Sequence, residues 1–452
     1  MPTPDRVDIA GLIDRQPIGR HQIVIVVVCA LMLVVDGFDT QMIGFAGPAI
    51  TAAFQADKSA LGPLLSAGVA GLMLGALVLG IAADRLGRRF TALVSLLIFG
   101  VFTLLAAFAT SLGMLTALRF LAGIGLGGII PNCVALVSEY APRRHHATLV
   151  TLLNAGFSIG AVLAGVGAGI LLPRYGWPSL FIAGGVLPLL LLPVGLVLLP
   201  ESIRLLALRG GRGAEIRRVV EKLHPQLRFA ADASFVAAEE SNDGSTVKHL
   251  FTSGRSSLTL LLWLTFFANL LVLYFLAGWM PTAMVARGLA ANVAVTATAL
   301  VYFGGVIGSL ALGWLMDRFG SHIVLGACYA IAAILLAVIA LAGTESGVIM
   351  AAAAVTGFCI VGGQNGLNAY AGGLYPTFIR STGVGWALGI GRIGGVLGPL
   401  VVGGLFALQW QVSSIFFVAI VPPIIGALAV LSLGAIAGRR AGGPAIADVS
   451  LG

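Results

Sequence analysis

Two acidic residues, Asp36 and Asp39, lie three positions apart inside the first long apolar run, from His21 to about Ala46. On a helix, side chains at i and i+3 share one face. A charge near the middle of a bilayer costs at least ~2.5–3.5 kcal/mol on insertion scales, so intramembrane acids usually serve an ion or proton pathway. The pair is therefore a candidate proton carrier. One alternative is a structural role, in which the two acids hydrogen-bond within a glycine-broken helix. The other is that the run is a soluble core helix and the two acids form its solvated edge.

The composition of the chain indicates a membrane protein. Of its 452 residues, 58% are hydrophobic and 10% are charged, whereas a soluble domain carries about 25% charged residues. A spanning helix needs ~20 apolar residues. The chain offers twelve such runs, at 20–46, 60–83, 90–109, 112–138, 147–171, 177–199, 257–285, 292–316, 322–342, 346–372, 381–407 and 413–437. The first is a full span, and acidic residues at 5, 8 and 14 argue against a cleavable signal peptide.

The distribution of the positive charges predicts orientation. The formal net charge is +8, but the cations concentrate in the tails and in alternate loops, so we expect a lipid bilayer as the partner and no nucleic acid. On the opposite side of the membrane lie only Lys58, Arg174 and Arg287. By the positive-inside rule, both termini are expected in the cytoplasm.

A repeat divides the chain into two halves. The polar segment 200–256 separates six spans in residues 1–199 (the first half) from six in residues 257–452 (the second half). The loop "GIAADRLGRR" recurs as "GWLMDRFGSH", so that Asp84 and Asp317 correspond at an offset of 233 residues. We expect the polar segment to be a cytoplasmic linker with amphipathic pieces. The predicted fold is all-α, with twelve transmembrane helices in two pseudo-symmetric bundles and a site between them.

These motifs resemble those of the major facilitator superfamily, over essentially the whole chain. Within it, "DGFDTQMIGFAGPAI", "LRFLAGIGLGGIIPN", "SEYAPRR" and "YPTFIRSTGVGWALGIGRIGGVLGP" resemble the aromatic acid/proton symporter family. The resemblance implies import of a small aromatic carboxylate with a proton, by alternating access, across a bacterial inner membrane. The alternative is a porter for another organic anion or a sugar. "PESIR" resembles a sugar-porter motif, but the acidic motif that sugar porters carry after helix 12 is replaced by "GRR".

Two arginines fall inside predicted spans. Arg119 is expected at about the same depth in the membrane as Asp39. Because an isolated buried charge costs more than a pair, we expect these two residues to pair. The alternative is that the Arg119 side chain extends toward the membrane surface. Arg392 lies near the midplane among glycines. It is expected to hold the substrate carboxylate through two parallel hydrogen bonds, or to pair with Asp36 or Asp39.

Two further groups of residues are assigned roles from their positions. Aromatic and amide side chains in the spans are expected to surround the substrate, or else to pack between helices: Phe38, Asn132, Tyr302, Gln364, Asn365, Asn368 and Trp386. Charged residues at the cytoplasmic helix ends are expected to form a gate that holds the inner side shut, or to be a topogenic positive face only: Asp84, Arg85, Arg88, Arg89, Glu139, Arg144, Asp317, Arg318, His322 and Arg380.

No cofactor, metal site or enzymatic activity is expected. The four cysteines all fall in predicted spans without a CxxC motif, and the histidines lie at helix ends or in loops. No set of ligands has metal spacing, and no glycine-rich phosphate loop contains a lysine. A sensor would need a soluble signalling domain, for which no segment is long enough. We expect a monomer.

Overall fold

The computed structural model describes residues 6–208, 213–223, 234–236, 247–252, 254–375 and 379–441. Twelve helices within these residues are long and apolar enough to cross a membrane, as predicted. In the first half they are α2 (Arg20–Ala53), α3 (Leu61–Leu86), α4 (Arg88–Ala106), α5 (Leu112–Tyr140), α6 (Arg143–Tyr175) and α7 (Pro178–Leu198). In the second half they are α10 (Ser256–Ala286), α11 (Ala291–Phe319), α12 (Ser321–Leu341), α13 (Ser346–Leu374), α14 (Arg380–Ala407) and α15 (Val412–Val418) continued by α16 (Val421–Ala441).

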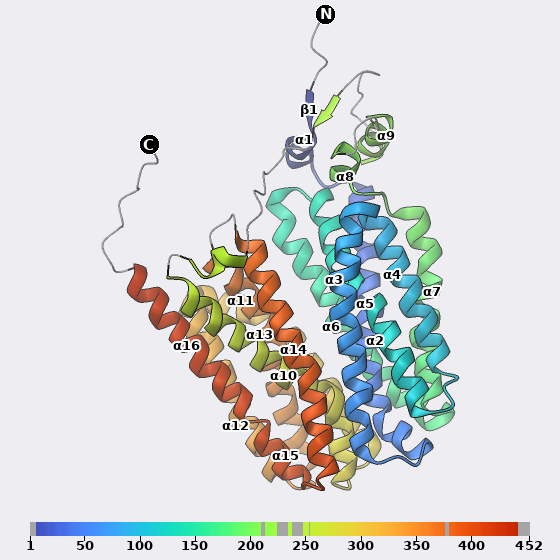
Figure 1. Cartoon of the computed structure of the whole chain (residues 1–452), viewed down its shortest axis with the longest axis vertical. Helices are drawn as coiled ribbons and strands as arrows, with labels where there is room; N and C mark the ends of the chain where they lie inside the picture. The colour runs from blue at the N-terminus through green and yellow to red at the C-terminus, as the bar shows by residue number, and fades with distance from the viewer. Residues whose placement is uncertain are drawn as a thin grey trace, which may run out of the picture.

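Short elements gather at one end of the bundle, which we call the linker side (Figure 1). They are α1 (Ile9–Arg15), α8 (Ile203–Leu208), α9 (Gly213–Leu223) and the 3-10 helix η2 (Val247–Leu250). The tail strand β1 (Arg6–Asp8) pairs in parallel with β2 (Ser234–Val236) of the polar segment. α9 is amphipathic and buries Ile216, Val220 and Leu223. The opposite end, which we call the far side, carries the 3-10 helix η1 (Lys58–Ala60).

The first helix is longer than predicted. We expected it to close near Pro48, but α2 continues through this proline to Ala53. Proline is tolerated in membrane helices when neighbouring groups satisfy the freed backbone. Pro48 has no N–H, so the Gly44 carbonyl loses its helical donor. The Thr51 hydroxyl donates to other carbonyl oxygens, those of Gly47 and Pro48, at 3.2 and 3.0 Å.

The two halves meet along three helix pairs, α14 with α3, α11 with α6 and α10 with α2. Figure 1 shows α14 and α3 side by side at the centre of the molecule. Close contacts that join these pairs lie toward the far side. Gly44 packs on the backbone of Ala277, Gly62 lies against Gly403, and the Ser66 hydroxyl donates to the Val396 carbonyl at 2.7 Å. A Cβ at Gly44 would lie only 2.0 Å from the Ala277 oxygen, so this seam closes backbone against backbone.

On the linker side the halves enclose a cavity of about 710 Å³. Its walls come from α6 of the first half and from α11 and α13 of the second, and they include Asn154, Ser158, Ser309, Asn365 and Asn368. The backbone contacts of the seam thus lie toward the far side, and this cavity lies toward the linker side.

The repeated loop motif makes the same turn twice. Gly87 ends α3 with φ +119°, and Gly320 ends α11 with φ +89°. Both values lie in the region that favours glycine. The conformation explains why the two copies of the motif keep this glycine at an offset of 233 residues.

The seam predicts a conformational mutant. Gly44→Val should force the far side apart and favour closure of the linker-side cavity, because the added side chain would collide with the Ala277 backbone. The measurement is the rate of thiol labelling at an introduced Asn154→Cys, since each native cysteine is 5% exposed or less. We expect slower labelling with Gly44→Val. The matched control is Gly404→Val, which adds the same side chain where nothing lies within 4 Å. Equal labelling rates in all three proteins would contradict the seam.

Candidate functional site

Asp39 and Arg119 form a buried ion pair, as the sequence predicts. Arg119 Nη1 lies 2.9 Å from Asp39 Oδ2, and the two residues are 2% and 0% exposed. The Thr103 hydroxyl donates to Asp39 Oδ1 at 2.7 Å. The guanidinium carbon lies 5.9 Å from the centre of the Phe181 ring, within cation–π range. Helices α2, α4, α5 and α7 therefore all contribute to the pair.

Asp36 lies one turn earlier on α2 and is fully buried. Its Oδ1 accepts a hydrogen bond from Thr40 on the next turn at 3.2 Å. Its Oδ2 has no hydrogen-bond partner within the described residues. Most buried polar atoms have a partner, so an exception needs an explanation. An oxygen without a donor can take up a proton without displacing a hydrogen bond.

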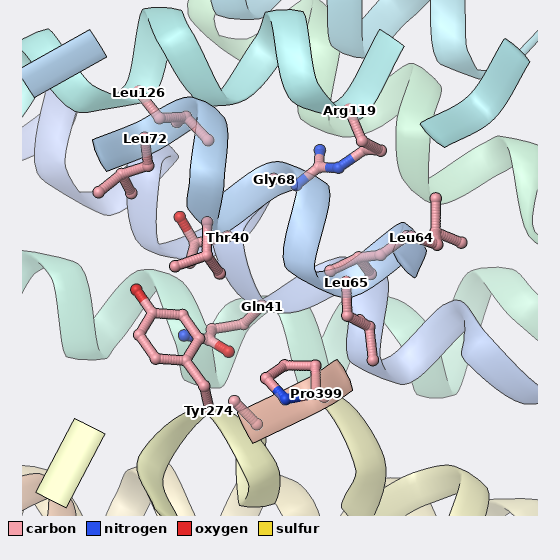
Figure 2. A pocket seen from close by; sticks show the side chains of 14 residues that line it. Thr40, Gln41, Leu64, Leu65, Gly68, Leu72, Arg119, Leu126, Tyr274 and Pro399 are labelled. Carbon is pink, nitrogen blue, oxygen red and sulfur yellow. The ribbon is translucent and has the colours of Figure 1, made fainter. Parts of the chain in front are cut away.

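A small cavity connects this region with the second half (Figure 2). Arg119, Thr40 and Gln41 line it from the first half, and Tyr274 and Pro399 from the second. Its volume is about 30 Å³, which is room for one or two water molecules. The cavity is therefore too small for an aromatic acid but large enough for a water-mediated path.

Arg392 lies on α14, partly buried, on the same helix as Pro399. Asp36 and Tyr274 are close enough to act on it electrostatically. No hydrogen bond or ion pair to its guanidinium occurs within the described part of the chain. Two roles were expected for Arg392, a contact with the substrate or an ion pair with an acid of the first half, and both stay predictions.

The four amide residues assigned to the substrate lie in two different environments. Asn365 and Asn368 line the linker-side cavity, and Gln364 donates to Asn368 Oδ1 at 3.1 Å. Asn365 donates to the Ser309 hydroxyl at 2.7 Å. Asn132, in contrast, is 3% exposed and donates to the Gly128 carbonyl of its own helix at 2.7 Å.

The three aromatic residues assigned to the substrate do not line the cavities described above. Phe38 is buried and packs beside Gly167 of α6. Tyr302 is buried and its hydroxyl donates to Gln41 Oε1 across the halves. Trp386 stacks on Trp263, with ring centres 5.9 Å apart.

Trp386 also lies on a different face of α14 from Arg392. It is 43% exposed and shares a stripe with three exposed residues at helical spacing: Ile393, Leu397 and Leu400. Because six residues separate Trp386 from Arg392, the two side chains point about 120° apart. Trp386 therefore lies on an exposed apolar face of α14, away from Arg392, and its assignment to the substrate stays a prediction.

The linker-side charges of the first half form one network, and it lies within that half. Arg88 Nε is 2.9 Å from Glu139 Oε1. Glu139 also accepts from the Ser202 hydroxyl at 2.6 Å, and Glu201 accepts from the backbone amide of Arg89 at 3.0 Å. Arg144 donates to the Gln16 carbonyl at 3.0 Å. This network ties α4, α5 and α6 to the segment after α7 and to the tail.

The other charged members of the predicted gate lie on the surface. Asp84, Arg85, Asp317, Arg318 and Arg380 are exposed. Arg318 lies over the rings of Trp314 and Phe319, which are on its own helix, and His322 packs against Gly434 of α16. A gate role stays a prediction.

Sequence reasoning missed several residues of these networks. Thr40 and Thr103, the donors to the two aspartates, carry no signal beyond being polar in a span. Glu201 and Ser202 belong to the "PESIR" motif, whose polar residues after a span were a usable signal. Asn269 lies 233 residues after Asp36, which is the offset of the repeat.

The chain thus has two six-helix halves, a tight seam between them toward one side and a cavity between them toward the other. This architecture is typical of a membrane transporter. A model of the Major Facilitator Superfamily matches residues 29–302 and 262–445. The chain belongs to this superfamily, a family of transporters rather than enzymes.

Two relatives that match nearly the whole chain are aromatic acid transporters. A gallate transporter from Pseudomonas putida is 39% identical over 434 residues, covering 96% of both chains. The 4-hydroxybenzoate transporter PcaK of Pseudomonas aeruginosa is 37% identical over 443 residues, covering 98% of this chain and 99% of the relative. A solved structure, the D-xylose-proton symporter, has a TM-score of 0.71 at 17% identity and covers 91% of this chain and 97% of its own. This last likeness concerns the fold alone.

The buried pair predicts a rescue in stability. Arg119→Met should lower the melting temperature strongly, because breaking a buried pair costs about 3–5 kcal/mol. Asp39→Asn combined with Arg119→Met should recover much of the loss, since no uncompensated charge remains. The measurement is thermal unfolding of the purified single and double variants. A double variant less stable than Arg119→Met alone would contradict the pairing argument.

Proposed function

We propose that the protein is a proton-coupled symporter that imports a small aromatic carboxylate of the 4-hydroxybenzoate or protocatechuate type. The observation that carries the proposal is the buried pair of Asp39 and Arg119 beside Asp36, whose free oxygen faces no donor. The relatives named for gallate and 4-hydroxybenzoate support the substrate class. The protein acts in a bacterial inner membrane with both termini, and hence the linker side, in the cytoplasm.

Proton carriage falls to the first half. Asp39 has two partners that hold it in place, whereas Asp36 has one oxygen free to bind a proton. The water-sized cavity beside Thr40 and Arg119 supplies a path toward the interface of the halves. No other acid is buried within the described residues of the spans.

Substrate binding falls to the second half and the linker-side cavity. A cavity of about 710 Å³ lies within the range of ligand pockets, ~300–1,000 Å³. Arg392 is the intramembrane cation without a hydrogen-bonded acid in the described part of the chain. A carboxylate held by two parallel hydrogen bonds would fix both the charge and the orientation of the ring.

Alternating access follows from the asymmetry of the two sides. With the linker side in the cytoplasm, the far-side seam is the closed outer gate, and the cavity opens inward. When the halves rock, the inner gate is formed by exposed charged residues: Asp84, Asp317, Arg318 and Arg380. The network around Arg88 and Glu139 keeps the first half rigid during that motion.

Proton coupling is tested by uptake of labelled 4-hydroxybenzoate into cells or proteoliposomes. Wild type should accumulate the acid, and a protonophore should abolish accumulation. Asp39→Asn should also abolish accumulation while the protein still inserts, because its carboxylate is lost from the proton site. Asp57→Asn, in a far-side loop, is the matched control and should behave like wild type. Accumulation by Asp39→Asn at the wild-type level would remove Asp39 from coupling.

The carboxylate contact is tested by binding of 4-hydroxybenzoate to purified Arg392 variants. Arg392→Lys keeps the charge but loses the planar fork; a hydrogen bond to a charged group contributes about 1.5–3 kcal/mol, so we expect affinity to fall roughly 10- to 100-fold. Arg392→Ala should not bind detectably. Arg174→Lys, at the far-side end of α6, is the control. Wild-type affinity in Arg392→Ala would exclude Arg392 from the substrate site.

A further inference from the structure

Three amide side chains in the second half form a directed chain of hydrogen bonds. Asn269 Nδ2 on α10 donates to Gln364 Oε1 on α13 at 2.7 Å. Gln364 Nε2 then donates to Asn368 Oδ1, one turn further on, at 3.1 Å. We call these three residues the amide chain. One end, Asn269, is 1% exposed, and the other, Asn368, lies on the wall of the linker-side cavity.

The buried end of the amide chain occupies a position that the repeat relates to Asp36. Asn269 is at the position of the second half that corresponds to Asp36, at the same 233-residue offset that relates Pro48 to Pro281. Its Oδ1 is buried without a hydrogen-bond partner within the described residues. The second half thus keeps a polar group at this position but no charge, which suits recognition of a neutral group better than proton carriage.

The cavity end offers a donor. Gln364 occupies Asn368 Oδ1, and no hydrogen bond from the Asn368 amide nitrogen occurs within the described part of the chain. An amide nitrogen has two N–H groups, so Asn368 can donate to an oxygen of a molecule in the cavity. A phenolic oxygen on an aromatic ring is such an acceptor, whereas an unsubstituted ring would leave these donors unpaired.

We propose that the amide chain recognises the ring hydroxyl of the substrate and makes the protein selective for hydroxylated over unsubstituted aromatic acids. This inference rests on the proposed function. Asn368 contacts the hydroxyl, and Gln364 and Asn269 are positioning residues that keep the Asn368 amide oriented with its nitrogen toward the cavity. A site built to hydrogen-bond a hydroxyl rejects the analogue that lacks it, because its own polar groups then lose their partner.

The test compares the dissociation constants of 4-hydroxybenzoate and benzoate, measured on the purified full-length protein. Wild type should bind 4-hydroxybenzoate about tenfold more tightly, as expected for one neutral hydrogen bond. Asn368→Leu should bring the ratio close to one by weakening 4-hydroxybenzoate alone. Asn269→Leu should reduce the ratio as well, whereas a merely structural role would weaken both acids equally. Asn292→Leu changes an exposed amide at the far-side start of α11, outside this cavity, and should keep the wild-type ratio.

The outcomes separate this inference from the proposed function. If wild type binds both acids equally, or if Asn368→Leu keeps the wild-type ratio, the amide chain does not read the hydroxyl, and the proposed function stands. If wild type binds neither acid, the proposed function fails and the inference fails with it. Asn368 lies on the cavity wall, so its variant remains informative even where the buried Asn269→Leu does not fold.

Discussion

The charge of Arg119 is the constraint on which the first half depends. A guanidinium enclosed by apolar helices is tolerated only with an acid and with donors that satisfy that acid in turn. Asp39 and Thr103 meet this requirement from two other helices, and Phe181 covers the cation from a third. The mutual position of α2, α4, α5 and α7 is therefore set by one ionic contact as well as by packing.

The two halves share a fold but differ in how they treat the equivalent place. The first half has acids at Asp36 and Asp39, whereas the second has Asn269 and the amides that follow it. An acid can exchange a proton with water, whereas an amide keeps fixed donors and acceptors. Under the functions proposed above, the first half carries the proton and the second half recognises the substrate by hydrogen bonding.

Much of this was predictable because strong physical rules operate on membrane sequences. The twelve spans follow from length and hydropathy, and the Asp39–Arg119 pair follows from the cost of a lone charge. The stacking of Trp386 on Trp263 was not predictable, because the spacing along one helix does not show which residue of another helix it meets. The exposure of Asp84 was not predictable either, because the sequence does not show how the helix ends of the two halves are placed. The end of α2 was misplaced because Pro48 was treated as a stop, although membrane helices tolerate proline.

The glycine seam on the far side also has an evolutionary consequence. A tight contact between side chains can drift, because a larger residue on one helix is compensated by a smaller one on the other. At Gly44, the neighbour is the Ala277 backbone itself, and at Gly62 it is another glycine, Gly403. Neither contact involves a side chain that a smaller residue could replace, so no second-site substitution in the pair can restore the fit. These positions should tolerate almost no variation among functional descendants of this chain, and revertants of a seam mutant should arise elsewhere, at residues that favour the far-side-closed arrangement by other means.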